Sequence, residues 1–143
     1  MKGKILVIED DKHWQSKLGR YLEEAGFYVE IVSDLDLALQ KVSSELFHFI
    51  TIDMSLDEGR SNAGNFEGWQ VLEIVKKLSV ESRTPTMVIT GFEVEYKKLI
   101  PEKDLQSIFF MGKGSFDREK FVETVVRAVD FHDLRFKDDH RSK

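Results

Sequence analysis

Short apolar runs alternate with longer amphipathic segments along most of the chain. Runs rich in β-branched and aromatic residues predict buried strands at residues 5–8, 27–32, 47–52, 86–90 and 107–111. Between them, apolar residues recur at helical spacing in residues 34–42, around residues 69–78, and after Asp11 and Asp117. Residues 93–105 carry a weaker helical pattern that Pro101 interrupts. Five strand–helix units predict one α/β domain.

Polar residues mark where these elements begin and end. Asp10 or Asp11 can cap the first helix, Gly26 can end it, and Asp117 can cap the last helix. Residues 57–65 are polar and glycine-rich, which predicts a loop. The polar residues 137–143 are expected to be frayed.

This alternation favours a doubly wound parallel sheet with helices on both faces, because parallel connections are right-handed. Periodicity does not give the strand order. In the flavodoxin-like order 2-1-3-4-5, the first and third strands are neighbours at the point where the winding reverses. That order would bring together Asp10 and Asp53, which follow these two strands.

Acidic residues follow both of those strands. Glu9, Asp10 and Asp11 come directly after the first strand, and Asp53 comes directly after the third. Ligands of open α/β sheets bind outside the carboxyl ends of the strands. Gathered carboxylates repel and raise one another's pKa, and a divalent cation relieves this. Mg²⁺ suits a few carboxylates, water and phosphate oxygens, so the pattern predicts a magnesium site.

Composition narrows the function further. The chain has 143 residues and a net charge of −5, which argues against direct nucleic-acid binding. It contains no cysteine, and no apolar run is long enough to span a membrane. The first strand has only four apolar residues in a row, too few for a signal-peptide core. We therefore expect a cytoplasmic protein that does not act at a membrane.

Five landmarks in order give the chain a family resemblance. They are Glu9-Asp10, Asp53, Thr90, Lys113, and the aromatic Phe110 three residues before that lysine. Over residues 3–131 the chain resembles a receiver domain of two-component response regulators. The resemblance implies that Asp53 accepts a phosphoryl group from a histidine kinase or phosphotransfer protein, in a Mg²⁺-dependent reaction.

The resemblance also implies roles for the other landmarks. Asp10, Asp53 and the backbone carbonyl of Ser55 would bind Mg²⁺, with Glu9 acting through a bound water. Lys113 would contact the phosphoryl oxygens. Thr90 would donate a hydrogen bond to the phosphoryl group, and Thr90 and Phe110 would shift together as the switch.

A receiver would act through protein contacts rather than as an enzyme with an external product. We expect residues 1–134 to form the receiver domain and residues 135–143 to be a polar tail or the start of a linker. The output would be a downstream protein target or an effector domain missing from this chain.

Three features depart from a typical receiver. Gly114 follows the lysine where most members have a proline, so the placement of Lys113 is open, and the peptide before Gly114 is expected to be trans or the loop differently shaped. The loop after Asp53 is about seven residues longer than usual, which costs little closure entropy. Pro101 lies in the fourth helical region, a signalling face in many receivers.

Other interpretations stay open. Asp10 can be a simple cap, Lys113 a structural ion pair, and Phe110 part of the core. The whole domain can be a receiver-like scaffold that takes no phosphate. A Mg²⁺-dependent phosphatase-like hydrolase also attacks with a strand-end Asp, but usually has a second Asp where this chain has Ser55. A flavin-binding domain fits the fold but not the acidic first loop.

Overall fold

The computed structural model describes residues 3–53, 84–91 and 108–141. Five parallel strands form one sheet in the order β2-β1-β3-β4-β5. The strands are β1 (Lys4–Ile8), β2 (Tyr28–Val32), β3 (Phe49–Ile52), β4 (Thr86–Thr90) and β5 (Phe109–Gly112). The predicted flavodoxin-like order is confirmed, and β1 and β3 are neighbours at the centre of the sheet.

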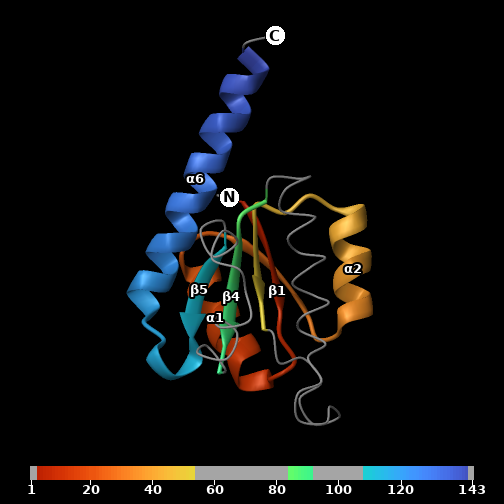
Figure 1. The fold of residues 1–143 in the computed structure, drawn as a ribbon, viewed down its shortest axis with the longest axis vertical. Helices are drawn as coiled ribbons and strands as arrows, with labels where there is room; N and C mark the ends of the chain where they lie inside the picture. The colour runs from red at the N-terminus through yellow and green to blue at the C-terminus, as the bar shows by residue number, and fades with distance from the viewer. Residues whose placement is uncertain (1–2, 54–83, 92–107, 142–143) are drawn as a thin grey trace.

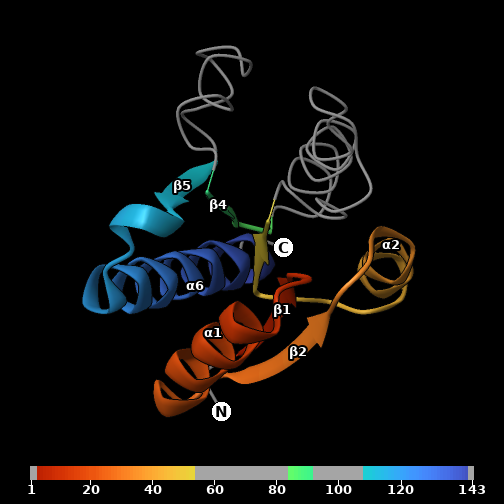
Figure 2. The ribbon, with the colours of Figure 1, turned by 90° about the horizontal axis from the view of Figure 1, so that it is seen from below.

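The helices cover both faces of the sheet, as the doubly wound prediction required. Figure 2 shows α1 (Lys12–Glu24) and α6 (Arg118–Arg141) on one face and α2 (Leu35–Ser44) on the other. Alternate residues of each strand therefore enter two separate cores. Ile5, Val7 and Phe49 pack beneath α1 and α6, whereas Leu6 and Ile50 pack with Ala38 of α2.

Aspartates begin all three described helices. The Oδ1 atoms of Asp11, Asp34 and Asp117 accept hydrogen bonds from the backbone N–H three residues later, at 3.1, 2.8 and 3.2 Å. Each bond satisfies an N–H that has no partner inside the helix. After α1, Gly26 turns the chain with φ 98°, a conformation that suits glycine. The predicted helix boundaries at Asp11, Gly26 and Asp117 are thus confirmed.

The last helix is longer than the sequence pattern predicted. Val129 is the last buried residue among those of α6 whose burial the structure describes, up to residue 131, and the helix continues to Arg141 and projects beyond the sheet in Figure 1. Residues 137–141 are helical, and their fraying stays a prediction. No glycine or proline interrupts residues 118–141, so the backbone chemistry allows the helix to continue past Val129.

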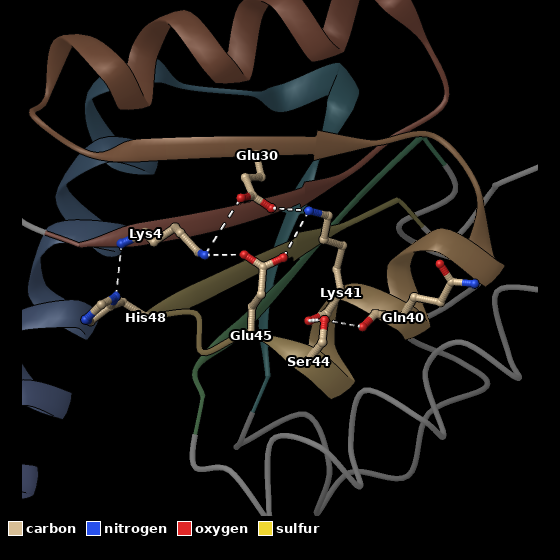
Figure 3. Close-up of polar contacts among 7 residues, drawn as sticks. All are labelled: Lys4, Glu30, Gln40, Lys41, Ser44, Glu45 and His48. Atoms are coloured by element: carbon tan, nitrogen blue, oxygen red, sulfur yellow. Dashed lines mark hydrogen bonds and ion pairs between the residues drawn. The ribbon is translucent and has the colours of Figure 1, made fainter.

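Alternating charges tie α2 to the sheet (Figure 3). Lys4 of β1 pairs with Glu30 of β2 at 3.7 Å and with Glu45, just after α2, at 2.5 Å. Lys41 of α2 pairs with the same two carboxylates at 3.1 and 2.9 Å. The hydrogen bond from Lys4, and then that from Lys41, lower the pKa of Glu45 to about 2. We call Lys4, Glu30, Lys41 and Glu45 the charge network.

Several predicted features lie outside the described residues. These are the helix around residues 69–78, the loop at residues 57–65, and the region of residues 93–105 with Pro101. Within the described ranges, no helix has the length and apolar character needed to cross a membrane.

Candidate functional site

The sheet register brings the acidic strand ends together. Ile8 of β1 lies opposite Ile52 of β3, and the backbone N–H of Asp53 donates to the carbonyl of Ile8 at 3.0 Å. On the other side of β1, the N–H of Glu9 donates to the carbonyl of Val32 at 3.0 Å. Glu9 and Asp53 are therefore held by the sheet ladder itself, at the carboxyl ends of neighbouring strands.

Three carboxylates converge at this edge. One oxygen from each of Glu9, Asp10 and Asp53 lies within 4.8 Å of the others. Glu9 and Asp53 are buried, at 1% and 2% exposure, whereas Asp10 is exposed. The acid cluster expected from the sequence thus exists, with one member open to solvent. The side chain of Asp11 caps α1 and does not belong to this cluster.

Lys113, directly after β5, reaches across the sheet edge to the buried acids. Its Nζ lies 2.9 Å from Oε1 of Glu9 and 3.1 Å from Oδ2 of Asp53. The lysine and the acids come from the ends of three different strands, and each had been singled out from the sequence. One ammonium faces three acidic groups, so the site would carry an excess of negative charge if all three were ionised.

The gathered acidic groups and their burial perturb the ionisation of the site. Burial raises the pKa of Glu9 to about 8, and the neighbouring Asp53 contributes in the same direction, while Lys113 opposes it. For Lys113, burial lowers the pKa, but its hydrogen bond to Glu9 and the charge of Asp53 outweigh burial, so its pKa is raised. The ammonium therefore stays charged at neutral pH.

Thr90 and Phe110 lie on β4 and β5, the two strands that follow β3 in the sheet. Thr90 ends β4, is fully buried, and lies opposite Gly112, the residue before Lys113. Phe110 is half-buried and packs against the core on the α2 face. The fold thus brings Thr90 to the same edge of the sheet as the acids, and it gives Phe110 a packing role whether or not it also switches.

The turn at Gly114 follows β5 without a cis peptide bond; none occurs among the described residues. Residues Lys113–Ser115 form a single 3₁₀ turn. A Cβ placed on Gly114 would meet nothing within 4 Å, and its φ is not in the left-handed region. The turn geometry therefore does not require glycine, and Lys113 reaches the acids without a following proline.

One neighbour of the site was expected only to pack in or near the core. The ring of Trp14, in the first turn of α1, has the Nζ of Lys113 over it at 5.2 Å from the ring centroid. Helical spacing explains the burial of one side of Trp14 but gives no sign of a lysine a hundred residues away. Only the packing of the turn after β5 against the start of α1 shows this contact.

The donor set fits a small divalent cation. Carboxylate oxygens are hard ligands, and two buried acids beside an exposed one match what Mg²⁺ takes from a protein. Ser55, whose carbonyl was predicted as a further ligand, lies outside the described residues.

Comparisons with known proteins agree with this geometry. The family model described as the response regulator receiver domain matches residues 5–106. The regulatory protein VirG of Rhizobium rhizogenes is 29% identical over 115 residues, which cover 80% of this chain and 44% of that protein. The chain thus spans less than half the length of this relative.

Solved structures share the fold at low sequence identity. A CheY-like response regulator receiver domain protein from Methanospirillum hungatei JF-1 has a TM-score of 0.73 and 20% identity, covering 92% of this chain and 97% of that one. The receiver domain of a sensor histidine kinase from Pseudomonas aeruginosa PAO1, solved with a magnesium ion in its active-site cleft, has a TM-score of 0.69 and 18% identity, covering 90% and 98%. Together with the family match over most of its length, the strand-end acids and lysine identify the chain as a member of the response regulator receiver domain family.

Proposed function

We propose that this receiver domain accepts a phosphoryl group on Asp53 from a phosphohistidine of a sensor kinase or phosphotransfer protein, with Mg²⁺ bound by Asp10 and Asp53. The observation that carries the proposal is the ion pair of Lys113 with buried Asp53, at the edge where Asp10 and Glu9 also converge. An ion pair alone would need one acid, whereas three acids invite a cation and an anionic substrate.

In the proposed reaction, a carboxylate oxygen of Asp53 attacks phosphorus, and the bond from phosphorus to the histidine nitrogen breaks. The product on this chain is an acyl phosphate, and the imidazole nitrogen leaves with the bonding electron pair. A bound Mg²⁺ would neutralise the acids and the phosphoryl oxygens. Ser55 would supply a further ligand through its carbonyl, and Glu9 would act through water.

The other residues would orient the group and read its arrival. The Nζ of Lys113, 3.1 Å from Oδ2 of Asp53, would follow the phosphoryl oxygens as a mobile charge. The hydroxyl of Thr90 would donate a hydrogen bond to the phosphoryl group, and Phe110 would repack with it. Phosphorylation would then shift the domain between two packings, which a downstream target or an attached effector domain would recognise.

Intact mass after incubation with acetyl phosphate and Mg²⁺ tests the proposal. We expect one phosphoryl group on the wild-type chain, none after chelation of the metal, and none in Asp53→Asn. Because Lys113 contributes positioning and charge, Lys113→Ala should be phosphorylated at least about tenfold more slowly. A wild-type chain that gains no mass would instead identify a receiver-like scaffold, and continuous release of phosphate from a generic phosphoester would indicate a hydrolase.

A further inference from the structure

The turn that carries Lys113 is anchored by an aromatic side chain three residues later. Phe116 packs edge-to-face on Trp14 of α1, with ring centroids 5.1 Å apart and planes at 81°. Phe116 also stacks on Tyr21 at 6.2 Å and contacts Phe121 of α6 at 5.2 Å. Gly114 supplies no stiffness, so these rings hold the turn against α1 and α6.

Trp14 contacts the lysine as well as the anchor. The Nζ of Lys113 lies over the indole at 5.2 Å from the centroid, on the way to Glu9 and Asp53. The backbone at Trp14 is held at the start of α1, because its N–H donates to Oδ1 of the capping Asp11. The Nζ of Lys17 also lies over the indole, at 4.4 Å from the centroid, but Lys113, whose side chain is only 17% exposed, is the cation that also contacts the buried acids.

We propose that Trp14 is a positioning residue for Lys113, holding its ammonium toward the acid cluster by a cation–π contact while its ring packs against Phe116. A flexible lysine otherwise has several rotamers to lose before it can serve the phosphoryl oxygens. The effect on phosphorylation rests on the proposed function, whereas the placement of Lys113 does not.

The variants Trp14→Leu and Trp14→Phe distinguish the effect of the aromatic ring from the effect of apolar bulk. Leucine keeps an apolar side chain but removes the π face, and phenylalanine keeps a π face. Tyr21→Leu is the matched control, since Tyr21 stacks on the same Phe116 and has its own cation, Arg118, at 4.7 Å from its centroid. Rates of phosphorylation are measured by intact mass with acetyl phosphate and Mg²⁺, and folding by circular dichroism.

We expect Trp14→Leu to slow phosphorylation about threefold to tenfold, the size of a partly desolvated cation–π contact. Trp14→Phe should recover most of the wild-type rate, and Tyr21→Leu should keep it. In a Lys113→Ala background, Trp14→Leu should cause no further loss, because the two residues act as one unit. An equal loss with and without Lys113 overturns the proposal.

A readout without phosphate or metal keeps this inference distinct from the proposed function. The indole ring current should shift the Lys113 Hε protons upfield in the metal-free protein, as seen by NMR. Trp14→Leu should remove that shift and Tyr21→Leu should leave it. Unshifted Hε protons in the wild-type chain overturn the placement of Lys113 even if Asp53 is phosphorylated. Shifted protons in a chain that takes no phosphate support the placement and reject the proposed function alone.

Discussion

Glu9 meets two opposed physical demands. Its backbone lies in the sheet ladder and its side chain is buried, which favours the neutral acid. Its neighbours Lys113 and the N–H of Asp11, whose bond to Oε2 is 3.1 Å long, favour the carboxylate. Burial and Asp53 prevail, and the pKa of Glu9 is raised to about 8. The ionised form of Glu9 is thus disfavoured in the metal-free protein.

The raised pKa of Glu9 predicts that the stability of the fold depends on pH. The folded carboxyl of Glu9 keeps its proton up to about pH 8, whereas the unfolded one loses it near 4.5. The folded state therefore binds the extra proton in this window, and the free energy of unfolding should fall as pH rises, by up to about 1 kcal/mol per pH unit. Urea denaturation with a chelator should show this slope in the wild-type chain and a shallower one in Glu9→Gln. Parallel slopes would contradict the raised pKa.

At the scale of elements, the acids and the lysine are placed by rigid strands, while α2 depends on side chains for its attachment. The charge network links β1, β2 and the end of α2 through two lysines and two glutamates (Figure 3). All four side chains keep roughly a quarter to a third of their surface exposed, so solvent screens their attraction. Because each charge has two partners, the charge network should contribute more to the stability of the fold than a single surface ion pair.

The charge network should stabilise the fold above a definite pH. The pKa of Glu45 is lowered from 4.5 to about 2 by Lys4 and Lys41. Its contribution is therefore complete above pH 4.5 and is lost as pH falls through this window toward 2. Glu45→Gln should lower the midpoint of thermal unfolding at pH 7 but change it little near pH 2. Glu23→Gln, which changes an exposed glutamate on α1, is the control. It should not reduce the difference between the unfolding midpoints at pH 7 and pH 2 as Glu45→Gln does.

For the whole molecule, the site and the fold are linked by mass action. A cation that binds only the native acid cluster raises the free energy of unfolding of the entire domain, by about 2.7 kcal/mol at a hundredfold excess over its Kd. The acidic groups that Glu9, Asp10 and Asp53 gather at one edge of the sheet, with the charge of Asp53 already opposing ionisation of Glu9, would be the source of this affinity.

Neighbouring aspartates give this linkage a matched test. Asp10 belongs to the acid cluster, whereas Asp11 caps α1, and asparagine can replace it as a cap. Thermal unfolding at increasing Mg²⁺ should show stabilisation of the wild-type chain and of Asp11→Asn at similar concentrations. Asp10→Asn should require markedly more Mg²⁺. Equal losses in the two variants would mean that general charge, not the cluster, attracts the ion.

The alternation of elements, the caps and the identity of the acids and Lys113 were predictable from the sequence, because they depend on local chemistry. Apolar β-branched runs have to be buried, and Asp11 and Asp117 satisfy nearby N–H groups. In the buried strands β1 and β3, the acids come only after the strand ends. Periodicity did not give the strand order, which was taken from the flavodoxin-like doubly wound fold, and the structure confirms it. From that order, Asp10 and Asp53 were expected to meet.

Tertiary structure decided what depends on residues distant in the chain. Three contacts leave no periodic pattern in the sequence. They are the ion pairs of Lys113 with the buried acids, the position of its ammonium over Trp14, and the charge network that joins β1, β2 and α2. The continuation of α6 to Arg141 was not predicted for a related reason, since the amphipathic pattern indicates where a helix is packed rather than where its hydrogen bonding ends. Local sequence determines which groups must be buried or solvated, and only the assembled sheet with its helices determines which of these groups come into contact.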